Sequence, residues 1–105
     1  MGKVIRVAIY RTNGTSEDKL VPNELSSLQG IVGGHIETLT LSRSLIVVCD
    51  EEGYIKHKRR NPFLDCIYGD FLICGAYGDE FASLTDIDKR TFETLIKERK
   101  TVCGR

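Results

Sequence analysis

The stretch LQGIVGGHIETL, residues 28–39, holds the junction that decides the fold of this 105-residue chain. Apolar residues recur at helical spacing up to Val32, and two glycines follow at once. Gly33 suits the left-handed conformation that ends a helix, and Gly34 lets the chain reverse. The sequence therefore predicts a helix that ends at a corner, followed directly by a strand over 35–41.

The residues Val21-Pro22-Asn23 indicate where this helix starts. Asn23 is a suitable N-cap, and Glu24 complements the positive end of the helix dipole. Gly30 lies inside the helix, where glycine costs about 1 kcal/mol relative to alanine. We therefore expect Gly30 to permit close packing rather than to help the helix form.

Four further segments have the composition of β-strands: KVIRVAIY (3–10), SLIVVCD (44–50), GYIKHK (53–58) and FLICGAY (71–77). The segment 44–50 is apolar on both faces, which favours a central place in the sheet. Gly53 is predicted to supply a positive φ in the hairpin before its strand. The polar segment RTNGTSEDK (11–19) is predicted to be an exposed, mobile loop, because Asn13-Gly14 favours a turn.

TDIDKRTFETLIKERK (85–100) carries the strongest helix pattern. Thr85 is its expected N-cap, and Phe92 leads the apolar stripe. Residues 101–105 are expected to form a frayed tail. The order β-α-β-β-β-β-α predicts a single α+β domain over residues 1–105, with a mainly antiparallel five-stranded sheet and two helices.

The composition is that of a soluble globular protein, with 41% hydrophobic and 29% charged residues. Fifteen Lys and Arg balance fifteen Asp and Glu, so no overall field directs the chain to nucleic acid or to a membrane. No apolar run approaches the roughly 20 residues that a membrane-spanning helix needs, and the N-terminus does not resemble a signal peptide. We expect a cytoplasmic location.

Sites for metals and catalysis leave recognisable patterns, and these are missing here. The four cysteines form no CxxC, and the two histidines complete no zinc-binding spacing. Phosphate-loop, GxSxG and HExxH patterns do not occur either. Cys49 and Cys74 lie in apolar runs, where a thiolate is disfavoured and a reduced cysteine acts as a small hydrophobe. The sequence predicts a protein that is not an enzyme and that needs neither metal nor cofactor.

His35 and Glu37 lie two residues apart on a predicted strand, so their side chains leave the same face. Leu39 and Leu41 continue that face, which therefore changes from apolar to polar toward the glycines. Such a pattern is typical of a pocket rim, and equally of an ordinary strand that leaves the core.

The only concentrated positive charge is KHKRR, residues 56–60. If the segment is a strand, Lys56, Lys58 and Arg60 project to one side and His57 and Arg59 to the other. Arginine binds phosphate with a planar fork. Flanking tyrosines, Tyr54 and Tyr68, offer rings on which a base can stack. The alternative is a solvated hairpin strand whose charges balance the acidic residues at 50–52.

Several motifs, in order, resemble a known family: LQGIVGGHIETLTL, LIVVCDEEGYI, Asn61, GDFLICG and DEFASLTDID. They are similar to the small family catalogued as domain of unknown function 3846, over residues 3–97. Its members occur largely in bacteriophages, plasmids and integrated mobile elements, so the resemblance implies that setting and a host-cell cytoplasm. It implies no catalytic residues. The chain departs from the usual pattern at Cys49-Asp50 and in the basic segment 56–60, which bears on ligand specificity.

Three functions follow as hypotheses. The first is a non-enzymatic protein that sequesters a small phosphorylated or nucleotide-like ligand, such as a host anti-phage immune signal, in a pocket completed between two copies. Its predicted ligand-binding residues are Gly33, Gly34, His35, Glu37, Tyr54, Arg59, Arg60 and Asn61. The second is a protein-binding inhibitor of a host factor. The third, nucleic-acid binding through KHKRR, is disfavoured because nothing extends that basic stripe.

Overall fold

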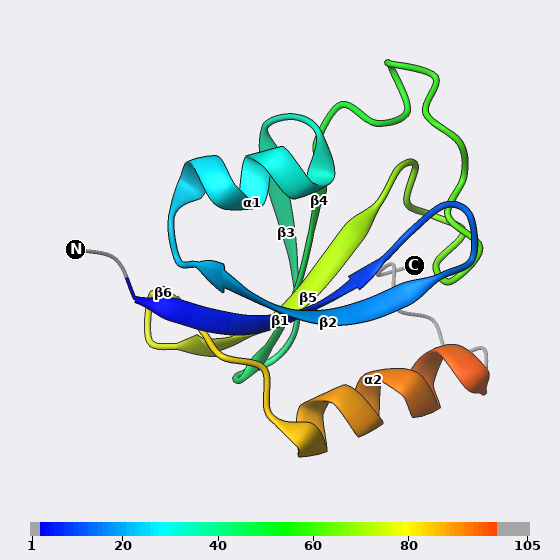
Figure 1. Cartoon of the computed structure of the whole chain (residues 1–105). Coiled ribbons are helices and arrows are strands. Elements are labelled where there is room, and N and C mark those ends of the chain that lie inside the picture. Colours follow the sequence, from blue (N-terminus) through cyan, green and yellow to red (C-terminus); the bar gives the residue numbers. More distant parts are fainter. Residues whose placement is uncertain (1–2, 99–105) are drawn as a thin grey trace.

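The computed structural model describes residues 3–98, which build one antiparallel sheet with a helix on each face (Figure 1). The strands are β1 (Val4–Tyr10), β2 (Ser16–Pro22), β3 (Ile36–Ser42), β4 (Leu45–Asp50), β5 (Phe71–Tyr77) and β6 (Glu80–Ala82). The helices are α1 (Leu25–Val32) and α2 (Asp86–Lys97). The strands follow the order β2-β1-β5-β4-β3, and β6 pairs with β5. The predicted α+β class, with two helices and an antiparallel sheet, is confirmed.

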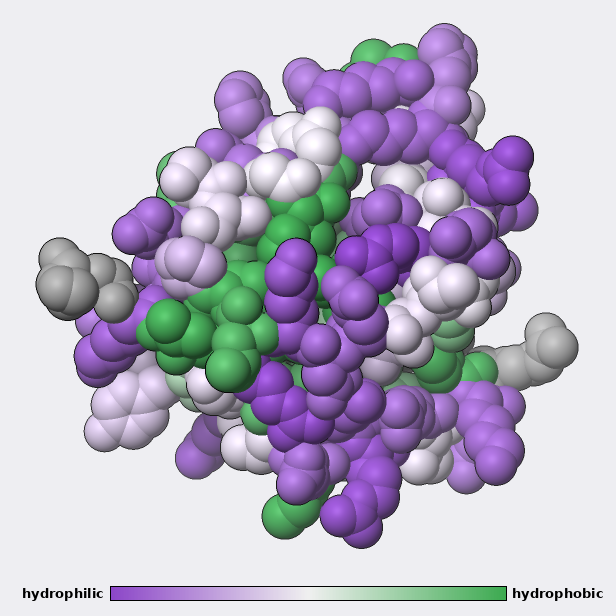
Figure 2. All heavy atoms as spheres, viewed as in Figure 1, coloured by the Kyte–Doolittle hydropathy of each residue, from purple (hydrophilic) through white to green (hydrophobic). Residues whose placement is uncertain are grey.

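Each face of the sheet has its own apolar cluster. On one face, Leu28 and Val32 of α1 pack against Val7 and Val48. On the other face, Phe92 of α2 joins a cluster that includes aromatic side chains of the sheet and Leu64 and Ile67 of the segment between β4 and β5. Figure 1 shows the two helices on opposite sides of the sheet. Figure 2 shows polar side chains over most of the visible surface, with apolar ones gathered beneath α1.

Four of the five predicted strands are confirmed as β1, β3, β4 and β5. The prediction that 44–50 is interior holds, since β4 lies between β3 and β5 and is buried on both faces. The centre of the strand order is nevertheless β5. The short strand β6, which forms a hairpin with β5 across Gly78, was not predicted.

The prediction of a loop over 11–19 is wrong for its second half. Residues from Ser16 onward form β2, which pairs with β1 along all seven of its residues. The turn itself lies at 11–15, where Gly14 has φ 89° and Asn13 accepts hydrogen bonds from Thr15. The strand escaped recognition because it is an edge strand with one buried side chain, that of Val21.

The prediction of a strand over 53–58 is also wrong. The main-chain amides in this segment bond locally, from Lys56 to Glu52, from His57 to Tyr54 and from Lys58 to Gly53. His57 adopts φ 61°, which no strand residue has. The basic residues therefore lie on a series of turns, and the predicted alternation of their side chains does not apply.

The N-cap predicted for α2 is confirmed, whereas the N-cap predicted for α1 is wrong. Asn23 is not the N-cap of α1; its side chain donates to the Phe81 carbonyl, and Glu24 occupies the cap position without a side-chain bond. A methyl group added at Gly30 would meet open space rather than a close neighbour, so the packing explanation for this glycine is wrong. Thr85 does cap α2, since its hydroxyl accepts from the Asp88 amide at 3.1 Å. Residues 99–105, with the predicted end of this helix and the tail, lie outside the described residues.

Candidate functional site

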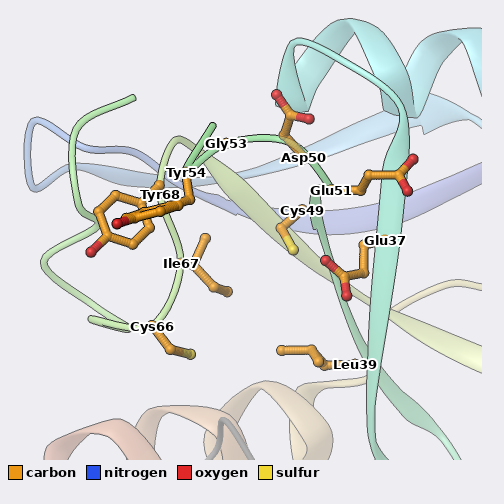
Figure 3. Close-up of a pocket in the computed structure, with 10 residues that line it drawn as sticks. All are labelled: Glu37, Leu39, Cys49, Asp50, Glu51, Gly53, Tyr54, Cys66, Ile67 and Tyr68. Atoms are coloured by element: carbon orange, nitrogen blue, oxygen red, sulfur yellow. The ribbon is translucent and has the colours of Figure 1, made fainter. Parts of the chain in front are cut away.

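A hollow of about 170 Å³ opens between the β3–β4 end of the sheet and the segment that leads from β4 to β5 (Figure 3). It lies on the α2 side of the sheet, because Leu39, Cys49 and Ile67 belong to the apolar cluster of that face. The lining residues are Glu37, Leu39, Cys49, Asp50, Glu51, Gly53, Tyr54, Cys66, Ile67 and Tyr68.

The sheet side of the hollow is built by strand register. Glu37 of β3 lies opposite Cys49 of β4, and Leu39 follows on the same face. Leu39 is half buried against the core while Glu37 is exposed, so the face changes from apolar to charged as the sequence predicts. Figure 3 shows the Glu37 carboxylate pointing into the hollow, toward the tyrosines.

Cys49 faces this hollow as a thiol rather than as a nucleophile. Burial first, and then the nearby carboxylates of Glu37 and Asp50, raise the pKa of the Cys49 thiol to about 11. A thiolate is the reactive form of cysteine. The side chain therefore contributes a small apolar surface to the pocket at neutral pH.

The opposite wall is aromatic. The rings of Tyr54 and Tyr68 meet edge to face, with centroids 5.1 Å apart and planes at 68°. Arg60 contacts Tyr68: its guanidinium carbon is 5.4 Å from the ring centroid, and Nη2 donates to the hydroxyl at 2.9 Å. Arg60 does not line the hollow itself, but it places a positive charge next to one of the two tyrosines that do.

Gly53 is needed where the two tyrosines meet. A Cβ on Gly53 would collide with the main-chain carbonyl oxygen of Tyr68, which cannot move like the end of a flexible side chain. Its φ is not positive, so the hairpin explanation for this glycine is wrong. The requirement is close approach of two backbone segments.

Two lysines of the turn segment 53–58 hold this segment against the end of α1. The Asp50 carboxylate is fully buried and accepts from Lys58 at 2.6 Å and Lys56 at 2.9 Å. Lys58 also donates to the Val32 carbonyl at 2.8 Å, and both ammonium groups reach the Gly33 carbonyl at 3.2 Å. Cations are favourable at this end of a helix, where the last carbonyls lack partners. These two lysines are therefore part of the framework.

Asp50 is held as a carboxylate by this arrangement. Burial on its own raises the pKa of Asp50, but hydrogen bonds from Lys58, the Glu52 amide and Lys56 outweigh it and lower that pKa to about 2. The same contacts account for Gly34, because a Cβ there would collide with the Lys56 ammonium group and the Asp50 carboxylate.

The glycine corner does not offer free amides. Gly33 adopts φ 83°, the left-handed conformation predicted for it, and its amide donates to the Gln29 carbonyl at 2.8 Å. The Gly34 amide donates to the same carbonyl at 3.2 Å. Both donors of the predicted anion cradle are thus used to end the helix.

The other predicted site residues lie in different surroundings. Asn61 is fully buried; its amide donates to the carbonyls of Tyr10 and Gly69, and its Oδ1 accepts from the Phe63 amide. Arg59 is exposed, and its carbonyl accepts from Gly69. His35 is exposed, and its carbonyl accepts from Glu51.

Of the eight predicted site residues, Glu37 and Tyr54 line the hollow and Arg60 touches its wall. Tyr68 was singled out in the sequence for its ring, and the face shared by Glu37 and Leu39 was the signal for the sheet side. Nothing in the sequence pointed to Cys66 or Ile67, because they come from an irregular segment whose path depends on tertiary contacts.

The chemistry available in the hollow is limited. The described residues contain no group of three or more His, Cys, Asp or Glu side chains placed to hold a metal ion. Within residues 3–98, no helix is both long and apolar enough to cross a membrane. The polar groups that line the hollow are carboxylates and phenols, and the rest of the lining is apolar or main chain.

Comparison with known protein families matches residues 5–97 to the family described as domain of unknown function (DUF3846). The match spans most of the chain, so the protein belongs to this family, and the resemblance noted in its sequence is confirmed. None of the curated proteins and none of the solved structures compared with the chain matches it.

Proposed function

We propose that this member of the domain-of-unknown-function family DUF3846 is a non-enzymatic binding protein that sequesters a nucleotide-like small molecule by holding its base in the hollow beside β3. The observation that carries the proposal is the pairing of an aromatic wall, Tyr54 and Tyr68, with the Glu37 carboxylate on the opposite side. An aromatic face and a facing hydrogen-bonding group are what a planar, polar heterocycle requires.

The size of the hollow supports a ligand that enters only in part. Its 170 Å³ is close to the roughly 150 Å³ of a cavity that accommodates benzene. A space of this size can take a planar ring of the ligand, whereas a whole nucleotide exceeds it. The sugar and phosphate would then remain at the rim, where Arg60 stands next to Tyr68 and can pair with phosphate.

The phosphate contacts differ from those proposed on sequence grounds. The amides of Gly33 and Gly34 are bonded to Gln29, and Asn61 is buried, so none of the three is included. Lys56 and Lys58 are committed to Asp50. The proposal therefore rests on the base for affinity and gives phosphate a minor part.

In a bacteriophage setting, which the family resemblance implies, removal of a host nucleotide signal is a role that needs binding without turnover. The proposed role is accordingly that of an anti-defence protein acting in the host cytoplasm. A homo-oligomer, in which a second copy completes the pocket, is kept as part of the proposal.

The test is a binding screen with the purified protein. Thermal-shift and native mass spectrometry measurements should use nucleosides, mononucleotides, dinucleotides and cyclic nucleotides. A ligand at a hundredfold excess over its Kd adds about 2.7 kcal/mol to the free energy of unfolding, which produces a clear rise in Tm. Tyr54→Ala should abolish that rise.

The matched control is Tyr77→Ala. Tyr77 is 83% exposed and Tyr54 is 72% exposed, but Tyr77 does not line the hollow. A screen in which no compound binds, or in which the two variants respond alike, would contradict the proposal.

A second candidate function is supported by the edges of the sheet. Among the described strands, β3 pairs only with β4, so its outer edge is open, and it carries neither lysine nor proline. The opposite edge strand, β2, is guarded by charged residues and ends at Pro22. An open edge of this kind can accept a strand from another protein, so inhibition of a host protein remains the alternative. Cross-linking at Thr38 or Thr40 in infected-cell lysate, followed by identification of a single host partner, would favour it.

A further inference from the structure

We infer that the hollow selects a guanine base, recognised by the Glu37 carboxylate through the two adjacent N–H groups at N1 and N2. This inference rests on the proposed function and names the ligand class. It follows from which hydrogen-bonding groups the pocket presents and which it does not.

The polar side chain that points into the hollow from the sheet is an acceptor. Figure 3 shows the Glu37 carboxylate directed toward the tyrosines, whereas the Asp50 carboxylate turns away from them, where it is paired with Lys56 and Lys58. Among the lining residues there is no lysine, arginine, histidine, asparagine or glutamine. A ligand that faces Glu37 must therefore supply the donors.

A carboxylate has two acceptor oxygens and forms its strongest contacts with two parallel N–H groups. Guanine presents such a pair, N1–H beside the 2-amino group. Adenine and cytosine each place an amino group beside an unprotonated ring nitrogen, which would face a carboxylate oxygen with a lone pair. Uracil presents one N–H between two carbonyl oxygens. Guanine is thus the common base whose edge matches the carboxylate without a repulsive contact.

The other residues that line the hollow suit the flat faces of the guanine ring. Leu39 and Ile67 supply apolar surface, and the Tyr54 and Tyr68 pair supplies aromatic surface across from the carboxylate. Cys49 adds a neutral thiol. A neutral heterocycle can lie among these groups without the loss of hydration that buried phosphate would suffer.

The guanidinium group of an arginine side chain also presents two parallel N–H groups. It is smaller than a purine and would leave part of the 170 Å³ hollow unfilled. The test includes it as a separate ligand, because binding of arginine would indicate a protein partner instead.

The experiment is isothermal titration of the full chain with guanosine, inosine, adenosine, uridine and N-acetyl-arginine amide. Inosine lacks only the 2-amino group, so it removes one of the two donors. A good bidentate contact discriminates by about 1–3 kcal/mol, and 1.4 kcal/mol is tenfold. Guanosine should bind at least about tenfold more tightly than inosine and more tightly still than adenosine or uridine.

Two variants test whether Glu37 makes the contact with the base. Glu37→Gln replaces one acceptor oxygen by a donor and should weaken guanosine binding about tenfold or more, while inosine loses less. Glu80→Gln changes an exposed glutamate of β6 that does not line the hollow and should leave all affinities unchanged. Because Glu37 is exposed, the variant should fold, which equal urea-unfolding midpoints would verify.

The outcomes separate the two proposals. Equal affinities for guanosine and adenosine, both lost in Tyr54→Ala, would overturn guanine selection and retain base binding. Tighter binding of the arginine derivative would overturn guanine selection in favour of a protein ligand. If no compound binds, both the inference and the proposed function fail.

Discussion

The contact between Asp50 and the two lysines gives the sharpest stability prediction. Its carboxylate is fully buried, bonded to Lys58, Lys56 and the Glu52 amide, and these bonds lower the pKa of Asp50 from 3.8 to about 2. Each pKa unit corresponds to 1.36 kcal/mol, so the ionised carboxylate stabilises the fold by about 2 kcal/mol. Asp50→Asn keeps the shape but removes the charge. We expect it to lower the free energy of unfolding by about 2 kcal/mol at pH 7.

The pH dependence provides a stricter test than the magnitude. Since the folded-state pKa of Asp50 is depressed, its contribution is fully present above the unfolded-state pKa near 3.8 and is lost as pH falls through about 2. The stability gap between the parent and Asp50→Asn should therefore be constant from pH 7 to pH 5 and shrink between pH 4 and pH 2.

The assay is urea unfolding followed by circular dichroism at pH 7, 5, 4 and 3. Asp79→Asn is the control, because Asp79 is exposed and the described residues include no ion-pair partner for it. A gap below about 0.5 kcal/mol at pH 7, the range of ordinary surface substitutions, would refute the reasoning. So would a gap that does not change on acidification.

Three further substitutions test separate parts of the structure by thermal or urea unfolding. Gly30→Ala should raise the free energy of unfolding by up to about 1 kcal/mol, because an added methyl group meets no atom within 4 Å; a destabilised variant would contradict this. Thr85→Ala should cost about 1 kcal/mol through loss of the α2 cap, whereas Thr85→Ser should cost little, and equal losses in both would count against a capping role. Gly53→Ala should destabilise the fold and weaken ligand binding, since its methyl group would push the Tyr68 backbone away; unaltered stability and binding would show that the two segments can separate freely.

The sequence was sufficient where one face of an element is buried in a regular way. β1, β4 and β5 carry long apolar runs, and α2 has both a cap and an apolar stripe, so local pattern and tertiary packing agree. Gly33 was identified correctly because helix termination is a local requirement on φ.

Prediction failed where distant contacts decide the conformation. The segment 53–58 has the alternating pattern of a strand, yet its lysines are drawn to a buried carboxylate and to the end of α1, which lies more than twenty residues earlier in the chain. β2 is polar because it is an edge strand, and its pairing with β1 is visible only in three dimensions.

In the candidate site, too, some features follow from the local sequence pattern and others depend on tertiary contacts. The same-face relation of Glu37 and Leu39 follows from strand periodicity, and the tyrosines were recognisable as aromatic surfaces. The burial of Asn61 against Tyr10 and the contacts of Lys56 and Lys58 with the end of α1 depend on partners far away in sequence. The glycine amides, in contrast, are bonded locally to Gln29.

We propose that the hollow between β3 and the tyrosine-bearing segment is the ligand site. The most direct measurement is a titration of 15N-labelled protein with guanosine, followed by amide chemical shifts. We predict saturable changes centred on Glu37, Leu39, Tyr54 and Tyr68, with Glu37→Gln requiring about tenfold more ligand to reach the same changes. Saturable changes centred instead on Gly33 and Arg59, or the lack of any saturable change with every nucleoside tried, would contradict the assignment of the ligand site to this hollow.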